Sequence, residues 1–381
     1  MPLPKEIIMP ALPRGRCSGL LPALAAVALA SSLASCSSSA TPARAKASAS
    51  ATSATASPSA TSATALSGGP ISPALPGRVA FRRYVDATKT TGALFTSNTD
   101  GSLEHQVLTP PANTEDDQPD WSPDGSRLLF TRHSGVTGGH EAQALWTVPS
   151  AGGKATALTA GAPARGDIIP GFDSAGSYSP DGRQIAYSHE GGRVAHDQLQ
   201  QSNIWVMAAN GTHVRQVTRF PDYAGDASGP QWSPDGKQLV FSLSNAASSQ
   251  PAGGRALFVI GADGTGQRQL TPWRLGANGT PDWSRTGLIV LRAVQDEESG
   301  VGNFFTIHPD GTGIHQVTHF TDDVISHKVG FSPDGKWIVF GRARTGGSIH
   351  TSLCKVDGSE LHPVTQTPLE DSSPDWTASS S

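Results

Sequence analysis

Histidines and carboxylates that could do chemistry gather in the variable segments of this 381-residue sequence. Imidazole and carboxylate ligands together suit a transition metal. Two neighbouring segments contain four histidines, with Glu141, Glu190 and Asp197 close by in sequence. The candidate metal ligands are His133, His140, His189 and His196. No ligand spacing among them is diagnostic, so ordinary solvent-exposed loop histidines remain the alternative.

A second group of polar residues lies where one repeat of the sequence leads into the next. We expect these segments to open on one face, and the candidate ligand-binding residues there are Asp116, Asp117, Asp173, Asp226, Asp323, His327 and Asp371. Glu115 and Glu370 belong to the same segments. An acidic channel mouth would attract a basic peptide segment, a cation or the hydroxyls of a glycan. Capping of turns at strand ends is the alternative role for any one aspartate.

A repeated sequence motif indicates which secondary-structure elements position these residues. An aromatic residue followed by Ser-Pro-Asp-Gly, or by a degenerate copy, occurs six times, beginning at Trp121, Tyr178, Trp232, Trp283, Phe331 and Trp376. Spacings from 57 down to 45 residues are typical of a propeller or another array of small sheets. Each repeated residue has a structural explanation, because Ser, Pro, Asp and Gly in this order suit a type I turn.

A second turn in each repeat completes the pattern. Asp-Gly, Asn-Gly or Gly-Gly recurs before the last strand, as at Asp263-Gly264, and such dipeptides are the strongest short hairpin signal. The repeats therefore predict an all-β, six-bladed β-propeller with four-stranded antiparallel blades. The first repeat, starting at Val79, lacks an innermost strand, and the strand ending at Trp376 lacks a blade. Pairing of the two should close the ring and remove exposed sheet edges.

These repeats resemble the TolB-like propeller family, whose repeat has the same aromatic-Ser-Pro-Asp-Gly core. The resemblance covers residues 77–381 and implies a role at the bacterial cell envelope, where TolB works in a complex with a peptidoglycan-associated lipoprotein. TolB carries an α/β domain ahead of its propeller. In this sequence a Ser/Ala/Thr/Pro-rich segment stands in that place, which is a departure from the TolB pattern.

The N-terminal part of the sequence has the features of an export signal. Lys5, Arg14 and Arg16 precede an apolar run from Leu20 to about Leu33, a positive region followed by a hydrophobic one. Leu33-Ala34-Ser35-Cys36 resembles a bacterial lipobox, which predicts lipidation of Cys36. An ordinary secretory signal, and a start at Met9 instead of Met1, are the alternatives.

We therefore expect a signal peptide at 1–35, a disordered tether at 36–76 and the propeller at 77–381. The tether composition cannot bury enough apolar surface to order itself. The expected product is a monomeric head, lipid-anchored on the extracytoplasmic side of a bacterial membrane, at the cell surface or in the periplasm.

Composition narrows the function classes. A net charge of -4 and a pI near 6.3 provide no basic field for nucleic acid. The folded region holds one cysteine, Cys354, expected to be a buried small hydrophobe. Gly171 to Gly176 has the wrong spacing for the nucleophile elbow of a hydrolase.

These observations favour a non-catalytic scaffold that binds an envelope protein or peptide, or a cell-wall or extracellular glycan. We expect an interaction protein and not an enzyme. We expect no cofactor, unless the histidines bind a divalent metal. The alternatives are a metal-dependent, lyase-like glycan enzyme and a carbohydrate-binding or sensor propeller.

Overall fold

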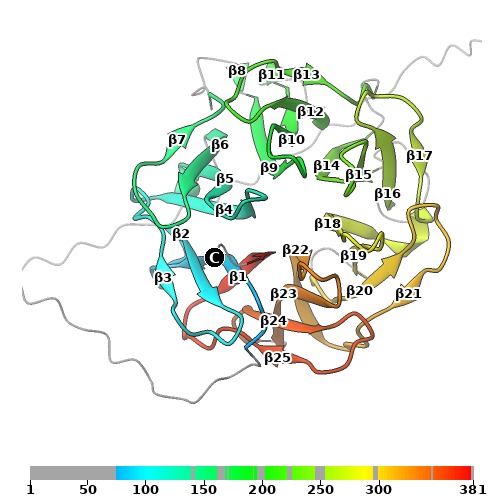
Figure 1. Cartoon of the computed structure of the whole chain (residues 1–381). Coiled ribbons are helices and arrows are strands. Elements are labelled where there is room, and N and C mark those ends of the chain that lie inside the picture. The colour runs from blue at the N-terminus through cyan, green and yellow to red at the C-terminus, as the bar shows by residue number, and fades with distance from the viewer. Residues whose placement is uncertain are drawn as a thin grey trace, which may run out of the picture. The chain divides into compact units, whose positions relative to one another are not determined.

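The described residues form a ring of small antiparallel sheets (Figure 1). The computed structural model describes residues 74–138, 142–160, 168–169, 171–191, 193–194, 202–220, 225–244, 254–294, 299–344 and 346–378, all within one unit at 65–381. Six blades of four strands surround a central axis, which confirms the predicted all-β propeller. The described part of the chain contains no helix long and apolar enough to span a bilayer.

The strands of each blade, from the axis outward, are as follows. Blade 1 has β26 (Asp371–Thr377), β1 (Arg78–Tyr84), β2 (Gly92–Asn98) and β3 (His105–Gln106). Blade 2 has β4 (Thr114–Trp121), β5 (Arg127–Ser134), β6 (Ala142–Pro149) and β7 (Thr156–Ala157). Blade 3 has β9 (Phe172–Tyr178), β10 (Gln184–Glu190), β12 (Ser202–Ala208) and β13 (Arg215–Gln216).

The second half of the ring repeats this order. Blade 4 has β14 (Ala227–Trp232), β15 (Gln238–Ser244), β16 (Arg255–Gly261) and β17 (Arg268–Gln269). Blade 5 has β18 (Ala277–Trp283), β19 (Ile289–Val294), β20 (Gly302–Ile307) and β21 (His315–Gln316). Blade 6 has β22 (Asp323–Phe331), β23 (Trp337–Arg344), β24 (His350–Lys355) and β25 (His362–Pro363). Outside the blades lie the pair β8 (Ile168–Ile169) and β11 (Arg193–Val194) and the short 3₁₀ helices η1 (Val136–Gly138) and η2 (Trp273–Leu275).

The ring closes through the two ends of the propeller sequence. Strand β26 pairs antiparallel with β1, and Val79 lies opposite Trp376. Trp376 packs with side chains of blades 6 and 1, including Val339 and Phe81. The predicted closure is therefore confirmed, and blade 1 obtains its innermost strand from the C-terminal end of the propeller.

The Ser-Pro-Asp-Gly motif forms the turn between the first and second strands of a blade. In blade 4, the amide of Gly236 donates to the carbonyl of Ser233 (2.8 Å). The Asp235 carboxylate accepts from the Ser233 hydroxyl (2.7 Å) and from the Lys237 amide (3.1 Å). Gly236 has φ +68°, in the left-handed region that glycine tolerates. The motif is thus fully used in making the turn.

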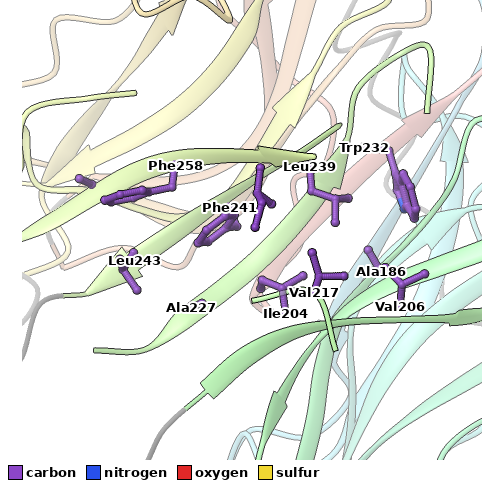
Figure 2. Close-up of a cluster of buried hydrophobic side chains, with 12 residues drawn as sticks. Ala186, Ile204, Val206, Val217, Ala227, Trp232, Leu239, Phe241, Leu243 and Phe258 are labelled. Carbon is purple, nitrogen blue, oxygen red and sulfur yellow. The ribbon is translucent and has the colours of Figure 1, made fainter. Parts of the chain in front are cut away.

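Hydrophobic side chains stack adjacent blades on each other. Figure 2 shows the cluster between blades 3 and 4, in which Ile204 and Val206 of β12 face Trp232, Leu239 and Phe241 of blade 4. The middle strands are buried on both faces, since each blade is covered by two neighbours. That is why Leu239, Val240 and Phe241 form an unbroken apolar run. Trp121 and Trp283 occupy equivalent inter-blade positions.

The alternation of strands gives the ring two different faces. The Ser-Pro-Asp-Gly turns and the outer hairpin turns lie on one side of the ring, which we call the short-turn face. The connections from second to third strand and from blade to blade lie on the other side, which we call the loop face. Leu75 exchanges two hydrogen bonds with Thr99 (2.8 and 2.9 Å), and Trp376 Nε1 donates to the Pro76 carbonyl (3.1 Å). The chain therefore enters the propeller at the short-turn face.

Candidate functional site

Every innermost strand contains an irregularity that alters its path near the loop face. The register shifts once in each of β26, β4, β9, β14, β18 and β22. At or beside the shift, non-glycine residues with positive φ are Gln118 (54°), Ala175 (50°) and Ser373 (52°). Bulges re-aim side chains and are over-represented near functional sites. They give the loop-face end of the channel a different lining from the regular strand.

One group of charged side chains at this end is built around Arg82 of β1. Arg82 Nε lies 3.3 Å from Glu115 Oε1 and 3.6 Å from Asp117 Oδ1, and its Nη2 lies 3.6 Å from Glu370 Oε1. The guanidinium stacks over the Tyr84 ring, 4.0 Å from its centroid, and the Tyr84 hydroxyl donates to Glu115 (3.1 Å). These five residues are named the Arg82 cluster below.

The Arg82 cluster carries more negative than positive charge. Three carboxylates face one guanidinium, and Glu370 has a further ion pair with Lys89 at 2.6 Å. Burial and the neighbouring Asp117 raise the pKa of Glu115. Burial opposes ionisation of Asp117, but Arg82 and His133 hold its pKa below the usual value. Arg82 has 7% side-chain exposure, and its Nη1 has no hydrogen-bond partner among the described residues.

Most of the other predicted binding carboxylates are held inside the blades by cross-strand bases. Asp116 pairs with Arg132 (2.6 Å), Asp371 with Arg83 (2.5 Å), and Asp323 with Arg342 (3.1 Å). In blade 3 a histidine takes the place of the arginine, and His189 Nδ1 lies 2.7 Å from Asp173 Oδ1. These pairs use the carboxylates to join the first and second strands.

The remaining predicted mouth residues lie apart from these pairs. The Asp226 carboxylate accepts from the Ser202 amide (3.2 Å), so it binds the first residue of β12. His327 is exposed in β22, at the shift in strand register. Of the predicted set, Asp117 is the one that the structure brings into the Arg82 cluster. Glu115 and Glu370, from the same connecting segments, are its other acids.

A second charged group lies deeper along the axis, and it was not predicted from the sequence. Lys328 of β22 extends to blades 1 and 2, where its Nζ lies 3.7 Å from Asp375 and 3.8 Å from Asp120 and donates to the Pro119 carbonyl. Lys328 is 3% exposed. Burial, with the nearby Asp375, raises the pKa of Asp120 to about 8, and burial raises that of Asp282 to about 6. Lys328 thus joins three consecutive blades, 6, 1 and 2, near the axis.

The same aspartates also connect neighbouring blades through the backbone. Asp120 accepts from the amide of Tyr178 (2.9 Å), Asp282 from Phe331 (2.7 Å) and Asp375 from Trp121 (2.9 Å). In each case the residue before the repeated aromatic binds the aromatic of the next blade. The sequence signal was present as Pro-Asp-Trp in three repeats, but its meaning depends on which strands meet at the axis.

The predicted metal ligands are only partly within the described residues. His133 lies in β5, close enough to Asp117 to lower its pKa. His189 is bonded to Asp173 and packs edge-on to Trp205, with ring centroids 5.2 Å apart. His140 and His196 lie outside the described residues, as does Cys36. Within the described ranges, no group of three or more His, Cys, Asp or Glu side chains has a geometry that could hold a metal ion.

Cys354 has the environment expected of a structural cysteine. It lies in β24 with no exposed surface, and it packs between Val290 and Ile338. Burial raises the pKa of its thiol to about 12, so the thiolate is scarce at neutral pH.

A closed six-bladed ring, in which Lys328 braces three consecutive blades and a charged cluster lies at one end, defines the molecule as a β-propeller. Residues 175–380 match the family model described as the TolB beta propeller domain. The chain belongs to this family. TolB of Acinetobacter baumannii has the same fold, with a TM-score of 0.56 and 18% identity over 79% of this chain and 66% of that one. Hydrazine synthase of Kuenenia stuttgartiensis superposes with a TM-score of 0.61 at 12% identity, over 80% of this chain and 47% of that one.

Two curated relatives are named as peptidases. The uncharacterized peptidase YuxL of Bacillus subtilis is 26% identical over 195 residues, which is 43% of this chain and 28% of YuxL. Dipeptidyl-peptidase 5 of Porphyromonas endodontalis is 32% identical over 110 residues, 28% of this chain and 15% of that protein. The chain thus spans less than a third of either relative.

Proposed function

We propose that this protein is a non-catalytic binding scaffold whose loop face receives a basic segment of an envelope protein or peptide. The Arg82 cluster carries the proposal. Three carboxylates from two strand ends surround one buried guanidinium, so the site retains negative charge that a ligand's lysine or arginine would neutralise. The unpartnered Nη1 of Arg82 supports a ligand that also brings an acceptor, as a peptide carbonyl does, because buried donors are normally satisfied.

The surrounding architecture supports the same role. The Lys328 group and the inter-blade bonds of Asp120, Asp282 and Asp375 brace the ring just below the cluster. Loops carried by a rigid scaffold are the usual place for binding residues. By contrast, the repeated Asp and Ser side chains of the short-turn face are used within their own turns.

The location proposed for this scaffold follows the N-terminal sequence. We take the protein to be exported and lipid-anchored through Cys36, with residues 36–76 as its tether. Because the chain enters the propeller at the short-turn face, the tether would be attached on the side opposite the Arg82 cluster and would leave the loop face open to a partner.

The proposal is tested with a fluorescein-labelled peptide rich in Lys and Arg, titrated with the full-length protein and followed by fluorescence anisotropy. The double variant Glu115→Gln/Asp117→Asn should weaken binding about tenfold, because it removes two carboxylates and leaves Arg82 to repel the peptide. The control variant Glu360→Gln removes an exposed carboxylate on the short-turn face and should leave the affinity unchanged. Equal affinities for the double variant and the wild-type protein would reject the site.

A further inference from the structure

An apolar groove lies on the outer rim of the ring between blades 4 and 5. Its volume is about 470 Å³, within the roughly 300–1,000 Å³ typical of ligand sites. Blade 4 contributes Leu270 and Leu275, and blade 5 contributes Phe305, Ile307 and Ile314. Ile314 is 46% exposed. A large aliphatic side chain therefore stands in water at the edge of an apolar depression.

The repeat provides an internal comparison for this groove. The corresponding groove between blades 3 and 4 is smaller, about 310 Å³, and polar. There Arg219 occupies the position of Pro272, and Gln267 occupies the position of Ile314, counted from the shared Thr and Asp-Gly markers. The propeller fold therefore does not itself require an apolar lining at this place.

Two further features indicate what could occupy the groove. Strands β17 and β21, which flank it, are the outermost strands of their blades, and a free strand edge can pair with an extended segment. Arg274 lines the groove, is exposed, and has no ion pair with any described residue. The groove thus combines an apolar floor with a positive charge at its rim, Arg274, that no acid within the described ranges neutralises.

The charge of Arg274 distinguishes between two possible occupants of the groove, residues 37–73 of this sequence and a segment of another protein. The sequence from 37 to 73 contains no Asp or Glu, and its charged residues are Arg44 and Lys46. That segment would bring positive charge to Arg274, so it is a poor match for the groove. A segment of another protein with an apolar side chain next to a carboxylate matches both the floor and the rim.

We propose that the groove between blades 4 and 5 is a second docking site, which binds an extended partner segment carrying an aliphatic or aromatic side chain beside an acidic residue. The apolar side chain lies against Leu270, Phe305 and Ile314, and the carboxylate pairs with Arg274. This site is independent of the Arg82 cluster, and it takes a ligand of opposite charge.

The test uses two fluorescein-labelled ten-residue peptides that contain Leu and Phe, one with Asp and Glu beside them and one with Lys in those places. The full-length protein should bind the acidic peptide in preference to the Lys peptide. Ile314→Glu should weaken binding of the acidic peptide at least tenfold, by placing a negative charge at the edge of the apolar groove. Arg274→Ala should weaken it and reduce its salt dependence.

Matched variants distinguish this groove from the rest of the rim and from the loop face. Val214 is 51% exposed at the equivalent position of blade 3, and Val214→Glu should leave binding unchanged. Glu115→Gln/Asp117→Asn should also leave binding of the acidic peptide unchanged. The groove proposal and the loop-face proposal can therefore each fail without the other.

Several outcomes would overturn the proposal: no saturable binding below about 1 mM, equal binding of the Lys peptide, or equal loss with Val214→Glu. Sedimentation that shows a dimer dissociated by Ile314→Glu would assign the groove to a second copy of this chain and would likewise overturn it.

Discussion

A few buried charged side chains connect the innermost strands at the centre of the ring. Lys328 of blade 6 extends to Asp375 of blade 1 and Asp120 of blade 2, and each aspartate also receives an amide from the next blade. Charges buried in this way are stabilising only while they remain paired and hydrogen-bonded. The protonation state of Asp120 should therefore affect the free energy of unfolding of the whole propeller.

Asp120→Asn should change how stability depends on pH. The pKa of Asp120 is raised to about 8 from an unfolded value of 3.8, so folding takes up a proton between these pH values and stability falls as pH rises through this window. Asparagine keeps the acceptor for Tyr178 but does not titrate. Denaturant unfolding at pH 5 and pH 8 should show a smaller loss of stability in the variant, by up to about 4 kcal/mol, since each pH unit within the window contributes about 1.4 kcal/mol. The control Glu360→Gln should keep the wild-type slope, and identical slopes for wild type and Asp120→Asn would contradict the raised pKa.

The axial residues also show where sequence reasoning stops. The type of Asp120 and its place before Trp121 were readable, but its partners come from positions 178, 328 and 375. Likewise, Asp116 and Asp371 resembled free acids of a channel mouth until strand register placed Arg132 and Arg83 opposite them. Composition and spacing identify charged residues. Only pairing across strands tells which charges are already compensated.

At the scale of elements, each outer hairpin is fitted to the blade before it. Gly211, in the turn between β12 and β13, has φ +85°, and a Cβ there would lie 2.6 Å from the Leu158 carbonyl oxygen of blade 2. Equivalent glycines approach Val107 and Val217 in the same way. The Asp-Gly and Asn-Gly signals that predicted hairpins thus have a second function, because they allow adjacent blades to approach closely.

A pair of alanine variants separates the two roles of these glycines. Gly266→Ala, at φ +66° with no atom within 4 Å of the added Cβ, should cost about 1 kcal/mol for the left-handed backbone alone. Gly211→Ala should cost a further ~1–3 kcal/mol, because the new methyl group meets the Leu158 carbonyl. Urea unfolding measures both. Equal costs would mean that the hairpin moves away from blade 2 without penalty.

For the whole molecule, local repeats were sufficient to predict the architecture. Turn chemistry fixed the number of blades, and the incomplete first and last repeats predicted the pairing of β26 with β1. The proposed binding surfaces were not predictable in the same way, since the Arg82 cluster and the rim groove each combine segments of two repeats. The ring has its entry at Leu75 on the short-turn face and its charged cluster on the other, so the proposed attachment and the proposed recognition use opposite faces.

The proposed attachment is tested by removing the candidate lipidation site. Cys36→Ala should release the full-length protein from membranes into the soluble fraction of cells, because stable anchoring depends on the acyl chains. Cys17→Ala changes a cysteine in the expected signal peptide outside the lipobox-like sequence and should leave the protein in the membrane fraction. The released protein should still bind the basic peptide, because the Arg82 cluster is confined to the propeller. Membrane retention of Cys36→Ala in washed membranes would show that the head is held by protein or lipid contacts instead of a lipid on Cys36.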